Sequence, residues 1–311
     1  MSTTVLPYHV PALLAETVGA LQVRPDGAYA DCTYGGGGHT MEIYRHIDPG
    51  KGGVIYGFDQ DSDAIERAPK DLPGLVMVHA NFRYLTNFMR LYGVDAKGGL
   101  DGVVADLGVS SHHFDDPGRG FSFRADGPLD MRMNRRATVT ASGILLTRTA
   151  DELANIFRLY GEFDKARRLA ETIVSARNSG ATFATTGEFL EIIRPLIDPR
   201  KEKKEQAQVF QALRIEVNAE LEALQCLLRG ALKVLRPGGR IAIITYHSLE
   251  DRLVKNFFKT GNFEGKLEKD FFGRATAPLK PVGNKPVVPT QSEQEQNPRS
   301  RSAKLRVAVK I

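Results

Sequence analysis

The sequence predicts an α/β fold in which a mainly parallel, Rossmann-like sheet is interrupted by an inserted helical domain. In the first third of the 311 residues, short apolar strands alternate with segments that have the apolar spacing of helices. Apolar strands separated by helices are typical of right-handed crossover units, and therefore of a parallel sheet. Strand signals then vanish through a long middle stretch and return near the end of the chain.

Four strands are expected in the first third, and a helix follows each of the first two. The strands lie in GAYADCT (27–33), GGVIYGFDQD (52–61), LVMVHANF (75–82) and LDGVVADLG (100–108). One helix is expected over HTMEIYRHI (39–47). Another begins at DSDAIERA (61–68), where Asp61 or Ser62 can cap the first turn.

The middle of the chain is expected to form an inserted, mainly helical substrate-recognition domain, residues 113–208. Its start is rich in turn residues, and three helical segments follow: TADELANIFRLYG (149–161), DKARRLAETIVSARN (164–178) and TGEFLEIIRPL (186–196). Residues 1–112 and 209–311 then make up the Rossmann-like domain.

The sheet pattern returns after one long helix, which is expected over residues 208–235. The turn RPGG leads into the strand of RIAIITYHSLED (240–251), and the helix RLVKNFF (252–258) follows. The closing SAKLRVAVKI (302–311) alternates well enough for a last strand. The Pro-rich stretch 273–302 is expected to be a loop or a partly disordered segment.

Composition bounds the class of protein. The formal net charge of +5 favours a polyanionic partner. Cys32 and Cys226 are the two cysteines, which cannot make a disulfide framework and offer no metal site. The first residues lack the pattern of a secretory signal, and no stretch approaches the ~18 apolar residues of a membrane span. We therefore expect a cytoplasmic protein that is not bound to a membrane.

The stretch DCTYGGGGHT (31–40) places four glycines between the first strand and its helix. A glycine turn at the carboxyl end of a first parallel strand lets a ligand approach the backbone, beside the free N–H groups of a helix N-terminus. Asp59 ends the second strand ~20 residues later, the place of an acid that binds ribose hydroxyls. This acid excludes a phosphate there, so the ligand is NAD, FAD or S-adenosylmethionine rather than NADP.

Asp31 favours the last of these three ligands. Gly35, Gly37 and Thr40 occupy the G-x-G-x-x-G positions, so the third glycine of a dinucleotide site is missing. A carboxylate at Asp31 would repel a pyrophosphate, but it can accept a hydrogen bond from the amino group of a methionine moiety. LKVLRPGGRIAIIT (232–245) also resembles the late helix, turn and strand of class I methyltransferases, and a C-terminal strand suits their antiparallel hairpin. The expected fold is therefore that of a class I S-adenosylmethionine-dependent methyltransferase.

Six stretches along nearly the whole chain make the resemblance specific. They are DCTYGGGGHT, ADLGVSS, RGFSFRADGPLDMRMN, FQALRIEVNAEL, RPGGRIAIITYHSLEDRLVK and NPRSRSAKLRVA, in this order. With them the chain resembles the RsmH (MraW) family, bacterial methyltransferases that act on the N4 amine of a cytidine in the decoding region of small-subunit (16S) rRNA. The resemblance implies S-adenosyl-L-methionine as the cofactor, and 16S rRNA or the small ribosomal subunit as the partner.

The resemblance also implies which residues line the donor site. Phe82 is placed to lie against the adenine. The other positions carried over are Gly37, Gly38, His39, Asp59 and Asp106. His113 is included with them, although this chain reads SSHHFDD where the family usually reads SSPQLDD. KEKKEQAQV (201–209) likewise replaces the usual HPATRT, so RNA contacts of that segment are not carried over.

The chemistry of the reaction points to Asp106. The N4 amine of cytosine is a poor nucleophile because its lone pair is delocalised into the ring, so an enzyme must orient it toward the sulfonium methyl and accept hydrogen bonds from it. No metal is required. Asp106 ends the fourth strand in the switch region of the sheet. We expect it where donor and amine meet, with Ser110 and His247 as further catalytic candidates. Whether Asp106 orients the base, contacts the donor or takes the proton stays open.

Two other classes of protein stay open as alternatives. A NAD-dependent oxidoreductase would use the same glycine turn, and a noncatalytic RNA-binding assembly factor would need only a basic tail. That tail carries four cations without an acid among them, which suits a phosphate backbone: Arg299, Arg301, Lys304 and Arg306. Asp130 beside Arg132 fits a structural ion pair or an RNA contact equally. The oligomeric state is left open.

Overall fold

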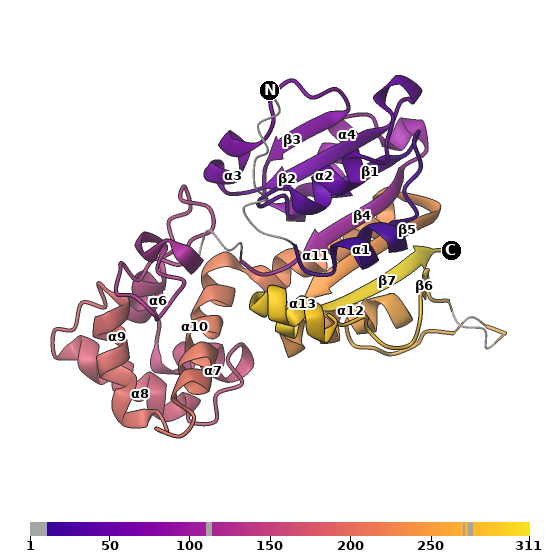
Figure 1. The fold of residues 1–311 in the computed structure, drawn as a ribbon. Helices are drawn as coiled ribbons and strands as arrows, with labels where there is room; N and C mark the ends of the chain where they lie inside the picture. Colours follow the sequence, from indigo (N-terminus) through magenta and orange to yellow (C-terminus); the bar gives the residue numbers. More distant parts are fainter. Residues whose placement is uncertain (1–10, 110–113, 270, 273–275) are drawn as a thin grey trace. The chain divides into compact units, whose positions relative to one another are not determined.

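The computed structural model describes residues 11–109, 114–269, 271–272 and 276–311. The chain divides into two compact units, shown with their elements labelled in Figure 1. One unit combines Met1–Gly108 with Glu222–Ile311, and the other is Val109–Leu221. Among the described residues, no helix has both the length and the apolar character that crossing a membrane would need.

The described residues of the first unit form one seven-stranded sheet with the order β3-β2-β1-β4-β5-β7-β6. Its strands are β1 (Ala28–Asp31), β2 (Val54–Asp59), β3 (Leu75–His79), β4 (Leu100–Asp106), β5 (Leu235–Thr245), β6 (Leu279–Pro281) and β7 (Lys304–Lys310). Strands β1 to β5 are parallel, whereas β7 runs antiparallel to both of its neighbours. The predicted class I fold, with a mainly parallel sheet and an antiparallel C-terminal strand, is confirmed.

Alternate residues of the strands bury opposite faces of this sheet, because successive side chains of a strand point to opposite sides. On one face, Val103 and Ile243 pack with residues of α4, α11 and α12. On the other face, Tyr29, Val104 and Ile244 pack with residues of α1 and α2. The sheet is thus covered by helices on both sides, which explains why its strands read as continuous apolar runs.

The helices of this first unit flank the sheet (Figure 1). They are α1 (Leu14–Leu21), α2 (Gly38–Tyr44), α3 (Ser62–Arg67), α4 (Leu85–Leu91), α11 (Glu220–Val234, within this unit from Glu222 on), α12 (Ser248–Thr260) and α13 (Gln291–Gln296). Asp61 caps α3, since its side chain accepts a hydrogen bond from the backbone N–H of Asp63, as the sequence predicts.

The second unit is helical and has a core of its own. Its helices are α6 (Ala141–Thr147), α7 (Ala150–Leu159), α8 (Ala166–Asn178), α9 (Thr186–Ile193) and α10 (Glu202–Asn218). The fully buried Phe157, Leu169, Phe189 and Leu213 bring four of these helices together. The α/β fold with a helical insertion is therefore the observed one.

The boundary of this unit extends beyond the predicted insertion of residues 113–208. The expected single helix over 208–235 is wrong, because Ala219 adopts the left-handed conformation with φ of 48° and separates α10 from α11. Helix α10 packs Phe210 and Leu213 into the core of the second unit, whereas α11 packs Leu227 into the sheet domain. The two halves of the apolar pattern thus serve different cores. That the helical unit recognises substrate stays a prediction.

Candidate active site

Three predicted acids lie at the carboxyl ends of neighbouring strands. Asp31 ends β1, Asp59 ends β2 and Asp106 ends β4. The strand order reverses between β1 and β4, because β2 and β3 lie on one side of β1, and β4, β5, β7 and β6 lie on the other. In open α/β sheets such a switch point is where ligands bind. The topology therefore brings the three acids to one edge of the sheet.

Asp31 organises the start of the glycine loop. Its side chain is fully buried, and one carboxylate oxygen accepts a hydrogen bond of 3.0 Å from the backbone N–H of Thr33. The other oxygen accepts a bond of 2.7 Å from the hydroxyl of Thr40 on α2. Thr40 stands at the third glycine position of the G-x-G-x-x-G spacing. Its hydroxyl therefore links α2 to the end of β1.

The geometry of the loop explains three of the four glycines. Gly35 and Gly37 have φ of 52° and 80°, a region that residues with a Cβ atom rarely adopt. A Cβ on Gly38 would lie 2.1 Å from Cγ of Pro11, whereas one on Gly36 would meet no atom within 4 Å. Tight turns and close packing thus require most of the run. That Gly37 and Gly38 also contact a ligand stays a prediction.

Asp59 connects the end of β2 to this loop. One carboxylate oxygen accepts a hydrogen bond of 2.8 Å from the backbone N–H of Gly35, and the other accepts one of 2.9 Å from that of Asp61. A short 3-10 helix, Phe82–Tyr84, follows β3. Its first residue, Phe82, is half-buried against the core between the sheet and α4. Nearby, the amide of Asn81 donates to the side chain of Gln60 at 2.8 Å.

Asp106 stands where four segments of the first unit meet. Its backbone N–H donates to the hydroxyl of Thr33 at 2.7 Å, which joins the ends of β4 and β1. The hydroxyl of Tyr246, which follows β5, donates to carboxylate oxygen Oδ1 at 2.8 Å. Nδ1 of His39, in the first turn of α2, lies 4.0 Å from Oδ2. The structure thus brings together the predicted residues Asp106 and His39.

The surroundings make Asp106 an unusually basic carboxylate. The pKa of its carboxyl group is raised to about 6, mainly by burial and to a lesser extent by the charges of Asp31 and Glu250. His39 and the hydrogen bond from Tyr246 act in the opposite direction. The side chain is still 21% exposed, so solvent or a ligand can reach it. At neutral pH the group is mainly ionised and can accept both hydrogen bonds and a proton.

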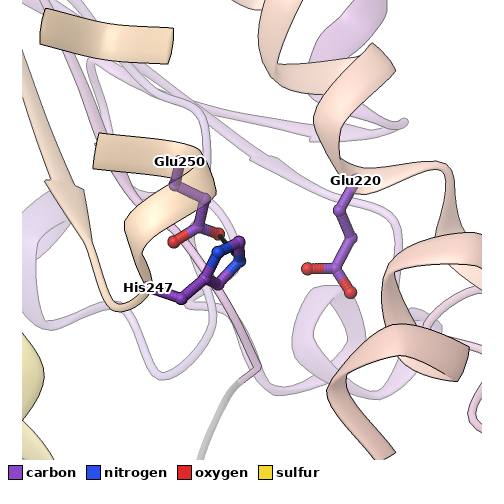
Figure 2. A group of neighbouring side chains, drawn as sticks. All are labelled: Glu220, His247 and Glu250. Atoms are coloured by element: carbon purple, nitrogen blue, oxygen red, sulfur yellow. Dashed lines mark ion pairs between the residues drawn. The ribbon is translucent and has the colours of Figure 1, made fainter. Parts of the chain in front are cut away.

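His247 faces a buried acid rather than open solvent. Figure 2 shows its imidazole beside the carboxylate of Glu250, and Nε2 lies 3.2 Å from Oε1. Only 8% of the His247 side chain is exposed. The other oxygen of Glu250 accepts a hydrogen bond of 2.9 Å from the backbone N–H of Tyr246, just before α12. Glu220, also drawn there, is paired with Arg214 within the helical unit. A catalytic role of His247 stays a prediction.

Two predicted residues, Ser110 and His113, lie outside the described residues, as does Ser111. Two residues at the site were not singled out from the sequence, Thr33 and Tyr246. Both stand just past the end of a strand, Thr33 two residues after β1 and Tyr246 immediately after β5. The polar side chains that follow strands are a signal that could have identified them, because parallel strands bring these positions to one edge.

Arg306 of the basic tail has an acidic partner that the tail itself lacks, and an RNA contact of the tail stays a prediction. Its guanidinium forms two hydrogen bonds with the carboxylate of Asp251 on α12, at 2.7 and 3.1 Å, and the side chains are 14% and 16% exposed. Lys304 Nζ also lies 4.0 Å from that carboxylate. The tail lacks acids in sequence, but β7 lies beside α12, and an acid of that helix pairs with Arg306.

Asp130 and Arg132 form the structural ion pair that was one of two expectations. Arg132 makes a bidentate contact with Asp130, and its guanidinium also donates to the backbone carbonyl of Ala137 at 2.6 Å. These bonds hold the turn before α6 in place, so most donors of this arginine are already used inside the helical unit.

The comparisons with known proteins cover almost the whole chain. Residues 7–311 match a family model described as the MraW methylase family. A protein of Parabacteroides distasonis named ribosomal RNA small subunit methyltransferase H is 59% identical, over 98% of each chain. A protein of the same name from Bacteroides thetaiotaomicron is 57% identical, over 98% of each chain. Another from Cytophaga hutchinsonii is 50% identical, over 97% of this chain and 99% of its own.

Proposed function

The chain belongs to the MraW methylase family, and on that premise we propose that it methylates the N4 amine of a cytidine in the decoding region of small-subunit (16S) rRNA, with S-adenosylmethionine as the donor. The likeness over full length to relatives named as methyltransferases of small-subunit rRNA carries this proposal. It gives no support to a NAD-dependent oxidoreductase or to a noncatalytic assembly factor. We place the activity in the cytoplasm, on rRNA or the small ribosomal subunit.

The residues at the carboxyl edge of the sheet fit this donor. Asp59 ends β2, the place of an acid that binds ribose hydroxyls in such sheets, and each of its carboxylate oxygens accepts a backbone N–H of the neighbouring turns. His39 is 4% exposed, and its Nε2 has no hydrogen-bond partner within the described part of the chain. A buried polar atom without a partner is costly unless a ligand satisfies it. The negative charge of Asp31, close to the loop, disfavours a pyrophosphate.

These observations support a donor site that includes most of the predicted residues. Asp59 would hold the ribose, Phe82 would lie against the adenine, and the loop with Gly37 and Gly38 would follow the methionine moiety. His39 and Asp106 would face the reacting end of the donor.

Bound S-adenosylmethionine supplies an electrophilic methyl group on a sulfonium centre. Asp106 accepts a hydrogen bond from the exocyclic amine and so directs the nitrogen toward that methyl group. Methylation of this amine would release one proton from the nitrogen. A carboxylate with a pKa of about 6 is a stronger base than an ordinary aspartate, so Asp106 is suited to take this proton and pass it to solvent.

The target base must leave its stack to meet this group. A base inside structured RNA reaches an active site only when it is single-stranded or turned out of the helix. The 21% exposure of the Asp106 side chain leaves the carboxylate accessible to such a base.

The test is methyl transfer from labelled S-adenosylmethionine to small ribosomal subunits and to free 16S rRNA, both from cells that lack this activity. We expect label in the small-subunit rRNA of at least one of the two, and none in large-subunit rRNA. Calorimetry should show binding of S-adenosylhomocysteine and none of NAD. Label in neither substrate, or binding of NAD alone, would overturn the proposed function.

A further inference from the structure

Tyr246 connects two acids of the site, Asp106 at the end of β4 and Glu250 on α12. Its hydroxyl donates to Oδ1 of Asp106 at 2.8 Å, and its backbone N–H donates to Oε2 of Glu250 at 2.9 Å. The ring is half-buried against the apolar core that β5 shares with α1 and α2. Both ends of this residue are therefore fixed, the backbone by α12 and the ring by the sheet domain.

The hydroxyl of Tyr246 is a permanent donor. Burial and the neighbouring Asp106 carboxylate raise the pKa of Tyr246 far above its ordinary value. It therefore stays protonated at neutral and moderately alkaline pH. A donor of this kind stabilises the ionised form of its partner, because a hydrogen bond to a charged acceptor is stronger than one to a neutral acceptor.

The bond also distinguishes the two oxygens of Asp106. Oδ1 is engaged by Tyr246, whereas Oδ2 lies 4.0 Å from Nδ1 of His39, too far for a hydrogen bond. A carboxylate that is held at one oxygen cannot turn freely about its last side-chain bond. Its second oxygen then keeps a fixed direction toward whatever group approaches.

We propose that Tyr246 is a positioning residue for methyl transfer, which holds Asp106 ionised and directs its Oδ2 at the incoming amine. This inference rests on the proposed function, since it names the residue that prepares the group facing the substrate. Tyr246 touches no reacting atom itself; it acts through Asp106. Among the described residues, the side chains whose charge or hydrogen bond acts on that carboxylate are Tyr246 after β5, His39 on α2, Asp31 on β1 and Glu250 on α12.

The variant Tyr246→Phe removes the hydroxyl and keeps the ring. Without the donor, the pKa of Asp106 should rise from about 6 by ~1 unit, the size expected for the loss of a hydrogen bond to a charged group. Methyl transfer that needs ionised Asp106 should then lose about fivefold at pH 6 and little at pH 9 through ionisation alone. Loss of orientation should lower the single-turnover rate further at all pH values, while KM for RNA stays the same.

The matched control is Tyr29→Phe, in which a buried tyrosine loses a hydroxyl that accepts a bond of 2.7 Å from the backbone N–H of Arg24. This variant should not change the pH dependence of the methyl-transfer rate. The carboxyl carbon of Asp106 can be followed by NMR in the complete protein and assigned with Asp106→Asn. In the wild-type protein, the ring carbon that bears the Tyr246 hydroxyl should shift with the same midpoint as this carboxyl group, a measurement that needs no folded variant.

The outcomes separate this inference from the proposed function. If the wild-type protein methylates RNA and Tyr246→Phe has the same rate and the same pH dependence, only the role of Tyr246 is overturned. A Tyr246 ring that does not respond to the titration of Asp106 overturns it as well. A wild-type protein that methylates no RNA removes both proposals. The inference is supported if the pH below which methyl transfer is lost rises in Tyr246→Phe and does not rise in Tyr29→Phe.

Discussion

The carboxylate of Asp59 accepts a hydrogen bond of 2.8 Å from the backbone N–H of Gly35, and so ties the end of β2 to the glycine loop after β1. The same group thereby orders the loop at the edge of the sheet where β2 ends. Donor binding should depend on this residue in two ways, through the ribose and through the shape of the loop.

Asp59→Ala should weaken the binding of S-adenosylhomocysteine by ~1.5 to 3 kcal/mol, since hydrogen bonds to charged groups have this strength. The loss corresponds to a roughly tenfold to 150-fold weaker affinity in calorimetry. Asp48→Ala is the matched control, because Asp48 also accepts a backbone N–H, that of Gly50 at 2.9 Å, in an exposed turn. An affinity that is equal in both variants would remove Asp59 from the donor site.

Asp106→Asn should slow the transfer of the methyl group. The amide has nearly the same shape, but it replaces a charged acceptor with a neutral group that can also donate. By analogy with the loss of one preorganised electrostatic group, we expect the single-turnover rate to fall on the order of 100-fold or more, with RNA affinity nearly unchanged. Asp101→Asn, in the same strand, serves as a control for folding effects. A wild-type rate in Asp106→Asn would show that the amine is oriented elsewhere, with His247 as the next candidate.

The same variant should stabilise the folded protein above pH 6. The folded-state pKa of Asp106 is about 6, above the value near 4 of an unfolded chain, so the folded state binds more protons between these values and wild-type stability falls as pH rises through them. Asp106→Asn escapes this loss. Urea unfolding should give it an advantage of about 1–3 kcal/mol at pH 8, which shrinks toward pH 4. A constant difference at both pH values would contradict the raised pKa.

Arg306 should contribute to stability rather than to RNA binding. Its ion pair with Asp251 is bidentate and only slightly exposed, so Arg306→Gln should lower the free energy of unfolding by about 1.5–3 kcal/mol. Arg301→Gln, an exposed position in the same tail, should change the free energy of unfolding by less than about 0.5 kcal/mol. It should instead reduce the salt dependence of RNA binding. Equal stability of the two variants would argue against the role of the Arg306–Asp251 pair.

The sequence alone predicts the sheet well because its strands are short apolar runs that end in polar residues. Asp31, Asp59 and Asp106 could be assigned to one edge for this reason, before their contacts were known. The side-chain contacts that the sequence did not predict join segments far apart in the chain. Asp251 neutralises Arg306 across 55 positions, and Tyr246 reaches Asp106 across 140 positions. The break at Ala219 was also missed, because the apolar pattern continues through it while the core that it serves changes.

We expect this protein to methylate the N4 amine of a cytidine in the decoding region. The most direct measurement is mass spectrometry of nucleosides and mapped fragments of small-subunit rRNA after incubation with the protein and S-adenosylmethionine, with Asp106→Asn in parallel. We expect one N4-methylated cytidine in the decoding region with the wild-type protein, and little or none with the variant in the same time. A methyl group on another atom or outside that region, or an rRNA without any new methyl group, would contradict it.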